Sequence, residues 1–227
     1  MTHAHPKLKP IVIAALLLIV LIFRLSPMIK STAPAGYPRL TVEHAGELVQ
    51  AWYDKTQPGR NPGEKNPLRE LTTDEIWSRM GVQVFKVTEG VHMFDSFLIR
   101  DGRVEPMGIA FGGYGVDALA VTDLDGNGQP ELLFTYSWGS GLHRAHLAVY
   151  SPALPKNGML AADLALMNGD LSLAKQDDRR VAVLGGLFNQ KPVQIGYAQL
   201  GGENGQPALT LRLDPNLPAA ILANMIH

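Results

Sequence analysis

The feature that most constrains this chain is a run of thirteen consecutive apolar residues, Ile11–Phe23, near its start. As a helix this run is about 20 Å long, which is short of the ~30 Å hydrocarbon core of a bilayer. Residues 11–29 together approach the required length, provided that Arg24 extends its charge toward the headgroups. Two lysines precede the run and favour a cytoplasmic N-terminus. We therefore predict a cytoplasmic segment 1–10 and a transmembrane signal-anchor 11–29.

A cleaved signal peptide is the main alternative, because an apolar run of this length also fits a signal sequence. The best small-residue cleavage site, Ala33-Pro34-Ala35, lies twelve residues beyond Phe23, farther than a signal peptidase normally reaches. A helix buried in the core is a third alternative. Either of the first two places the remainder outside the cytoplasm, as a single-pass membrane protein or as a secreted one. We expect a linker at 30–40 and one extracytoplasmic β-rich domain at 41–227.

Charge and cysteine content exclude several classes of protein. The whole chain has a net charge of −1, with 20 Lys and Arg against 21 Asp and Glu. The first thirty residues contain four of the bases and no acid, so the remainder has 16 bases against 21 acids, a net charge of −5. This balance argues against a nucleic-acid partner, which requires a basic surface. The absence of cysteine excludes disulfides, thiolate metal sites and cysteine nucleophiles.

Two short helices are expected at the start of the exported domain. Thr41 is a typical N-cap, and apolar residues recur at helical spacing from Val42 to Trp52. Thr72 and Glu75 fit a capping box for a second helix, which Gly81 would end.

Beyond these helices the sequence predicts a mainly β (α+β) fold of antiparallel sheets, arranged as a sandwich or barrel-like. Short stretches rich in β-branched and aromatic residues are separated by glycine-containing turns, and Asp101-Gly102 is a strong signal for a tight hairpin. A loop at 201–205 marks another hairpin, and 161–167 is expected to form a further short helix. The expected strands are Val82–Val87, Phe97–Ile99, Arg103–Glu105, Ala118–Thr122, Glu131–Ser137, His143–Tyr150, Val181–Leu184, Val193–Leu200 and Ala208–Leu213.

The segment 123–131 carries the most specific chemical signal, because oxygen-bearing residues alternate in it with glycines. Calcium takes about 6–8 oxygen ligands at ~2.3–2.6 Å, and a tight loop of this composition supplies several of them. We expect side-chain oxygens, a backbone carbonyl and a final carboxylate to bind one structural calcium ion. The alternative is a plain hairpin turn with solvated acids. The predicted metal ligands are Asp123, Asp125, Asn127, Gln129 (through its carbonyl) and Glu131.

This strand–loop–strand pattern resembles the calcium loop of FG-GAP/VCBS repeats, the blade units of integrin-type β-propellers. The likeness covers residues 111–138 and includes the segment Phe111-Gly112-Gly113. It implies a calcium-loop role for the five residues above, but not a propeller, which needs four or more blades. The EF-hand pattern fits less well, because Phe134 stands where that loop has a bidentate glutamate and the flanks have the composition of strands.

Ser140, His143 and His146 form a weaker constellation in a glycine-rich segment. The residues around Ser140 do not match the G-x-S-x-G motif of hydrolases, and two histidines three positions apart on a strand point to opposite faces. We therefore expect no catalytic residue with an evident role. The sequence favours a membrane-anchored binding or structural module, attached through 11–29, with an unknown protein or glycan ligand and a calcium-braced loop. The alternative is a secreted or anchored hydrolase that uses these three residues.

Overall fold

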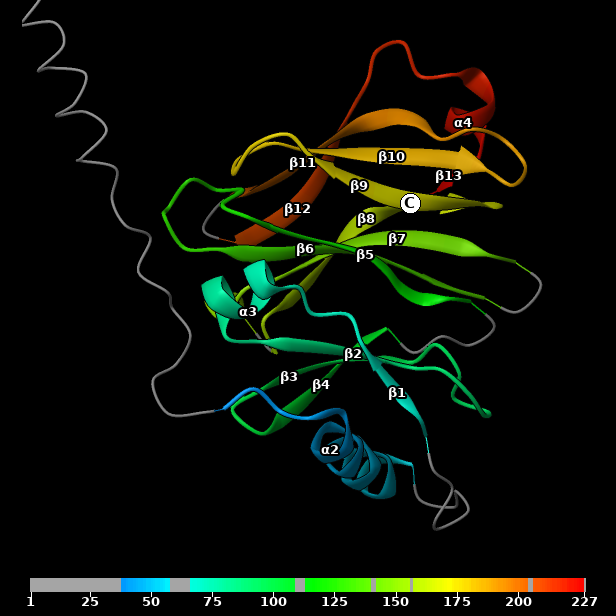
Figure 1. The fold of residues 1–227 in the computed structure, drawn as a ribbon. Helices are drawn as coiled ribbons and strands as arrows, with labels where there is room; N and C mark the ends of the chain where they lie inside the picture. The colour runs from blue at the N-terminus through cyan, green and yellow to red at the C-terminus, as the bar shows by residue number, and fades with distance from the viewer. Residues whose placement is uncertain are drawn as a thin grey trace, which may run out of the picture. The chain divides into compact units, whose positions relative to one another are not determined.

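The computed structural model describes residues 38–57, 66–108, 113–139, 142–155, 157–203 and 206–226 (Figure 1). These residues form a mainly β fold of three antiparallel sheets with few helices, which confirms the predicted class. The segments 1–10 and 11–29 lie outside the described residues, as does most of the linker. No helix in the described ranges is long and apolar enough to cross a membrane.

Each sheet is built mainly from strands that follow one another in the chain. The first sheet has the order β1-β2-β3-β4, with strands Leu68–Glu70, Gln83–Val87, Ser96–Arg100 and Arg103–Gly108. The central sheet has the order β13-β8-β7-β6-β5, in which β5 to β8 are Gly115–Thr122, Glu131–Trp138, Arg144–Tyr150 and Met159–Met167, and β13 is Met225–Ile226. The third sheet has the order β12-β11-β10-β9, in which β9 to β12 are Gly169–Lys175, Val181–Leu187, Val193–Glu203 and Gln206–Leu213.

The central sheet is buried on both faces, and successive residues of β6 show why. Leu132 and Phe134 point into a core shared with the first sheet and α3 (Asp74–Met80), whereas Leu133 points into a core shared with the third sheet. Side chains alternate between the faces of a strand, so an unbroken apolar run fills two cores at once. The three sheets therefore form successive layers, which Figure 1 shows from bottom to top in chain order.

Helix α2 (Val42–Thr56) covers the other face of the first sheet through Ala45, Val49 and Tyr53. Thr41 caps it as predicted, because the Thr41 hydroxyl accepts from the His44 backbone N–H. A short helix, α4 (Ala219–Ala223), packs at the far end of the chain and was not predicted.

The predicted cap of α3 is wrong by one residue. Thr73, not Thr72, is the N-cap, and its hydroxyl accepts from the Ile76 backbone N–H. The Thr72 hydroxyl instead accepts from the Val84 N–H at 2.8 Å and so ties the helix entry to β2. Gly81 ends the helix in the left-handed conformation, at φ 63°, as predicted.

The predicted helix at 161–167 is wrong, because these residues belong to strand β8. The register between β7 and β8 shifts between His146 and Ala148, since His146 pairs with Ala165 and Ala148 with Ala161. Extra residues in β8 break the alternation of its side chains, and the buried positions Ala162, Ala165 and Leu166 fall at helical spacing. The spacing of buried residues in this irregular strand thus matches the spacing expected for a helix.

All nine predicted strands are present, with ends that differ by a few residues. The hairpin at Asp101-Gly102 is confirmed: both residues have positive φ, 51° and 72°, as the tightest hairpin turn requires. Strands β1, β9 and β13 were not predicted. Strand β9 follows β8 after the single residue Asn168, which has a φ of 55° and connects the central sheet to the third sheet.

Candidate metal site

The predicted calcium loop connects β5 to β6, adjacent antiparallel strands of the central sheet. Thr122, the last residue of β5, pairs directly with Glu131, the first residue of β6. The loop therefore begins and ends at one point of the sheet, and its flanks are strands rather than the helices of an EF-hand. Phe111 and Gly112, part of the FG-GAP/VCBS likeness, lie outside the described residues.

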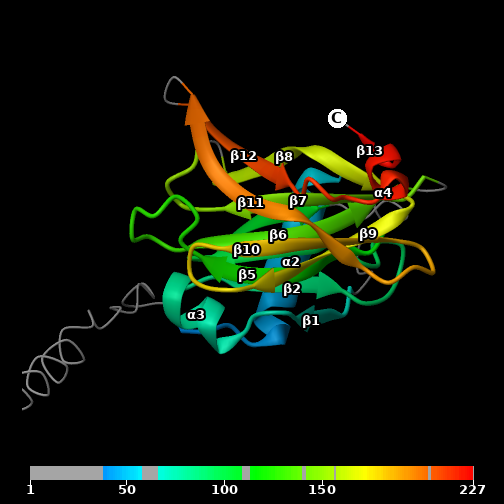
Figure 2. The same ribbon diagram turned by 90° about the horizontal axis from the view of Figure 1, so that it is seen from above.

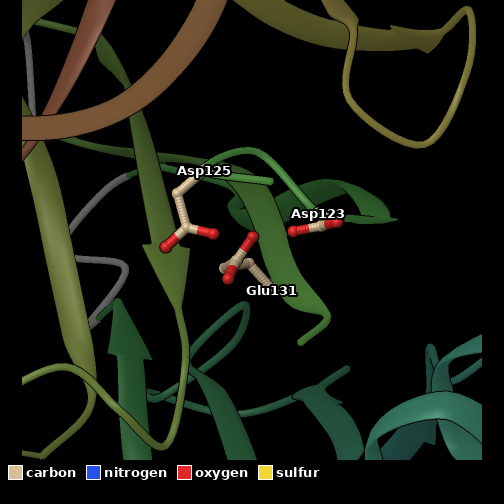
Figure 3. A group of neighbouring side chains, drawn as sticks. All are labelled: Asp123, Asp125 and Glu131. Carbon is tan, nitrogen blue, oxygen red and sulfur yellow. The ribbon is translucent and has the colours of Figure 1, made fainter. Parts of the chain in front are cut away.

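The loop brings three of its five predicted ligands together. One carboxylate oxygen from each of Asp123, Asp125 and Glu131 lies within 4.8 Å of the others. Figure 3 shows the carboxylates of Asp123 and Asp125 on either side of that of Glu131. Two oxygens that bind the same calcium ion at ~2.4 Å are at most about 4.8 Å apart, so this spacing suits a single shared ion.

Backbone N–H groups hold each of these carboxylates in place. The Gly128 N–H donates to both oxygens of Asp123, at 3.2 and 3.3 Å. The Asn127 N–H donates to Asp125 at 3.0 Å, and the Leu124 N–H donates to Glu131 at 2.8 Å. Gly128 itself has a φ of 85°, a conformation that glycine adopts without a steric penalty. The positions of the acids are therefore set by the loop backbone.

The other two predicted ligands belong to the same loop. Asn127 lines a pocket of about 240 Å³ together with Asp125 and Glu131. Its side-chain oxygen accepts from the Gln129 backbone N–H at 2.7 Å. The metal-binding roles of the Asn127 side chain and the Gln129 carbonyl stay predictions.

Burial of Glu131 changes the pKa of its carboxyl group. Glu131 is 1% exposed, and this burial raises its pKa to about 7, with a smaller contribution from the charges of Asp125 and Asp123. The Leu124 hydrogen bond acts in the opposite direction. A cation placed among the three carboxylates would stabilise the ionised form of Glu131.

The turn 176–180 supports this loop, and sequence reasoning missed its role. In this turn the Asp178 carbonyl accepts from the Asp123 N–H at 2.6 Å and from the Thr122 hydroxyl at 2.8 Å. The Arg179 guanidinium donates to the Gly126 carbonyl at 3.4 Å and lies 3.9 Å from the Asp123 carboxylate. More than fifty positions separate the two segments, so no local pattern indicates this contact.

The structure does not bring His143 and His146 into one site. The Nε2 atom of His143 lies 2.8 Å from Asp170 of β9. His146 stacks instead on Tyr136 and Trp138 of β6, with ring centroids 5.1 and 5.8 Å away. The two histidines therefore have different partners, and Ser140 of the hydrolase alternative lies outside the described residues.

The likeness to FG-GAP/VCBS repeats thus remains confined to one loop. Those repeats form propellers of four or more blades, whereas the described residues form three sheets. Comparison of the chain with protein-family models, with curated proteins and with solved structures found no match.

Proposed function

We propose that this protein is a membrane-anchored, extracytoplasmic binding or structural module whose loop 123–131 is braced by calcium. The observation that carries the calcium role is the convergence of Asp123, Asp125 and Glu131 within 4.8 Å. Hard oxygen ligands on a tight loop suit calcium better than softer metals, which favour nitrogen or sulfur.

A structural role for the ion follows from its neighbours. The loop closes the β5–β6 connection, and its carboxylates accept hydrogen bonds from the loop's own backbone N–H groups. A bound ion would therefore stabilise the loop by offsetting repulsion among three acids. At ~5 Å and an effective dielectric of ~20, two full like charges repel by about 3 kcal/mol, and exposure of Asp125 reduces this value.

The extracytoplasmic location is proposed from the apolar run Ile11–Phe23 together with the calcium loop. Extracellular calcium modules bind with a Kd of ~10⁻⁴–10⁻³ M, which suits a single loop with an exposed acid such as Asp125. A cytosolic location would leave so weak a site empty.

Thermal unfolding of the full chain in detergent tests the calcium role. At a calcium concentration near 100 times Kd, binding adds about 2.7 kcal/mol, which raises Tm by roughly 5–10 °C for a domain of this size. Excess chelator should reverse the increase. Asp125→Ala should abolish it, whereas Glu89→Ala, at an exposed acid in another turn, should keep it. The same Tm for the wild type in calcium and in chelator would refute calcium binding.

Cell fractionation tests the location separately. The full chain should sediment with membranes and resist extraction by carbonate, and protease added outside sealed cells or spheroplasts should degrade the 41–227 domain. Recovery of the intact chain in the cytosol would rule out the anchor and leave the calcium result to be judged alone.

A further inference from the structure

The outer face of the third sheet carries a groove of about 1200 Å³ that runs along β11 and β12. Polar side chains from the middle of both strands line it, and Arg179 and Arg180 from the turn before β10 line it as well. Figure 2 shows β11 and β12 as one long twisted hairpin beside β10. The groove also contacts Leu124 of the candidate calcium loop.

A β-bulge in β11 decides which side chains face this groove. Val183 of β10 pairs with Gly196 and Leu184 pairs with Gln194, so Ile195 is an extra residue in the strand. Ile195 is buried in the core between the sheets, as is Ala198. Because the bulge changes the alternation, Tyr197 and Gln199 lie on the opposite, outer face.

The facing strand β12 completes the same surface. Leu209 and Leu211 pack into the core, which leaves Thr210 and Arg212 on the outer face. Tyr197 pairs across the hairpin with Arg212, and Gln199 pairs with Thr210. Side chains of such pairs lie side by side, so an arginine, an aromatic ring and two neutral hydrogen-bonding groups form a continuous strip.

The groove is positively charged although the chain as a whole has a net charge of −1. Three arginines line it against a single lining acid, Asp214, although one of the three, Arg179, lies 3.9 Å from the Asp123 carboxylate. Within the described residues, neither Arg180 nor Arg212 forms an ion pair with a carboxylate. These two guanidinium groups are therefore free to bind an anion.

Arg180 is also held in position before any ligand arrives. Its guanidinium lies 4.0 Å from the centroid of the Tyr197 ring, a cation–π contact. The Tyr197 hydroxyl lies 3.4 Å from both Gln176 and Gln194, which fix the ring in turn. A positioned planar guanidinium is well suited to two parallel hydrogen bonds with a carboxylate.

The neutral side chains between Arg180 and Arg212 limit the class of ligand that the groove can bind. β11 and β12 pair with each other from Gly196–Leu213 to Glu203–Gln206, so the face of this hairpin presents side chains rather than backbone groups. A ligand that lies on this face is therefore recognised through side chains. Gln199 and Thr210 offer donors and acceptors that match hydroxyl groups, while the arginines match carboxylates.

We propose that this groove binds an acidic oligosaccharide, with uronate carboxylates on Arg180 and Arg212 and sugar hydroxyls on Gln199 and Thr210. The inference rests on the proposed function only in taking the domain to be a binding module. It does not require calcium in the loop.

Calorimetric titration of the full chain in detergent with hexagalacturonate tests this proposal. Excess chelator is present throughout, because uronates bind calcium themselves. Wild type should bind the hexamer and not a neutral galactose hexamer of the same length. Arg180→Ala and Arg212→Ala should each weaken binding about tenfold, the effect of losing one charged hydrogen-bond partner. Arg69→Ala, an exposed arginine of β1, should change nothing.

Three results would overturn the proposal: no binding of the hexamer, equal binding to the arginine variants, or equal binding of the neutral sugar. Tighter binding of hexaglutamate than of hexagalacturonate would show an acidic-peptide site instead. Arg212→Lys, which keeps the charge and loses the planar fork, should bind between wild type and Arg212→Ala. The titration is made without calcium, so an absence of uronate binding would not affect the evidence from thermal unfolding for calcium binding. Likewise, an absence of calcium binding would not affect the titration.

Discussion

Arg79 on α3 holds the carboxylate of Asp178 through both terminal guanidinium nitrogens, at 2.7 and 2.9 Å, although the two residues are 99 positions apart. The carbonyl of the same Asp178 accepts from the Asp123 N–H. One residue therefore joins a helix of the first core to the start of the candidate calcium loop. Lys175 also reaches this cluster and lies 2.9 Å from Asp178.

The Arg79–Asp178 pair should contribute measurably to stability. A double-mutant cycle with Arg79→Ala and Asp178→Ala should give a coupling of about 1 kcal/mol, since Arg79 is only 14% exposed but Asp178 is 45% exposed. Urea unfolding in chelator measures it. The Arg39–Asp74 pair is the control, because Asp74 is fully exposed and its coupling should be close to zero. A coupling near zero for both pairs would contradict this assignment.

The Arg79–Asp178 pair should also make the stability of the domain depend on pH. The hydrogen bonds from Arg79 hold the pKa of Asp178 below its usual value, against the opposing effect of burial. The stability that this lowered pKa contributes is present above the unfolded pKa of ~3.9. It is lost as the pH falls through the pKa of Asp178 in the folded state. Arg79→Ala should therefore lose less stability than wild type between about pH 5 and pH 3. Parallel curves for the two proteins would contradict the prediction.

Glu131 predicts a pH dependence of the opposite sign. In chelator its pKa of about 7 lies above the unfolded value of ~4.3, so the folded state binds more protons between these values. Stability should fall by about 2 kcal/mol as pH rises from 5 to 8, and Glu131→Gln should remove most of this change. Urea midpoints across this range measure the effect. Calcium should also flatten the wild-type curve, because it favours the ionised carboxylate.

Arg179 should weaken calcium binding, since its positive charge lies 3.9 Å from an oxygen of Asp123. The Arg179 side chain is 69% exposed, so the effect is modest and screened by salt. Arg179→Gln should tighten the Kd for calcium about two- to fivefold at low ionic strength, with little change at 0.5 M salt, where the Debye length is only ~4 Å. Calorimetric titration with calcium checks this, and Arg69→Gln should leave the Kd unchanged. Weaker binding by Arg179→Gln would show that the residue supports the loop instead.

Two glycines with positive φ should differ strongly when replaced by alanine. A Cβ at Gly115 would overlap the Phe94 carbonyl oxygen, whereas a Cβ at Gly128 would meet nothing within 4 Å. In chelator, Gly128→Ala should cost about 1–2 kcal/mol from the left-handed backbone alone. Gly115→Ala should cost several kcal/mol more or prevent folding, because the backbone must shift. Similar midpoints for the two variants in urea would contradict this packing.

Local patterns predicted much of this fold, and the failures have physical causes. Capping by Thr41, the turn at Asp101-Gly102 and the presence of strand β2 depend on neighbouring residues and were predicted from them. Strand β8 was mistaken for a helix because its irregular pairing with β7 places buried residues at helical spacing. The choice between Thr72 and Thr73 as cap depends on the Val84 N–H, which reaches Thr72 only in the folded chain.

Only part of the candidate metal site could likewise be predicted from the sequence. The acids of the loop follow from a short motif, because glycines and alternate oxygen ligands are adjacent in sequence. The support from Asp178 and the nearby charge of Arg179 come from a turn that only the stacking of the third sheet brings close. The groove on β11 and β12 depends on the bulge at Ile195, which no sequence pattern in that strand predicts.

Burial of the central sheet on both faces has a consequence for the way the domain opens. Neither outer sheet can separate without exposing one half of the side chains of β6 to water, so partial unfolding from either side is costly. The amides in the middle of β6 should therefore exchange with deuterium only when the whole domain unfolds. Their exchange rate would report the global free energy of unfolding, and the hairpin ends would exchange far sooner.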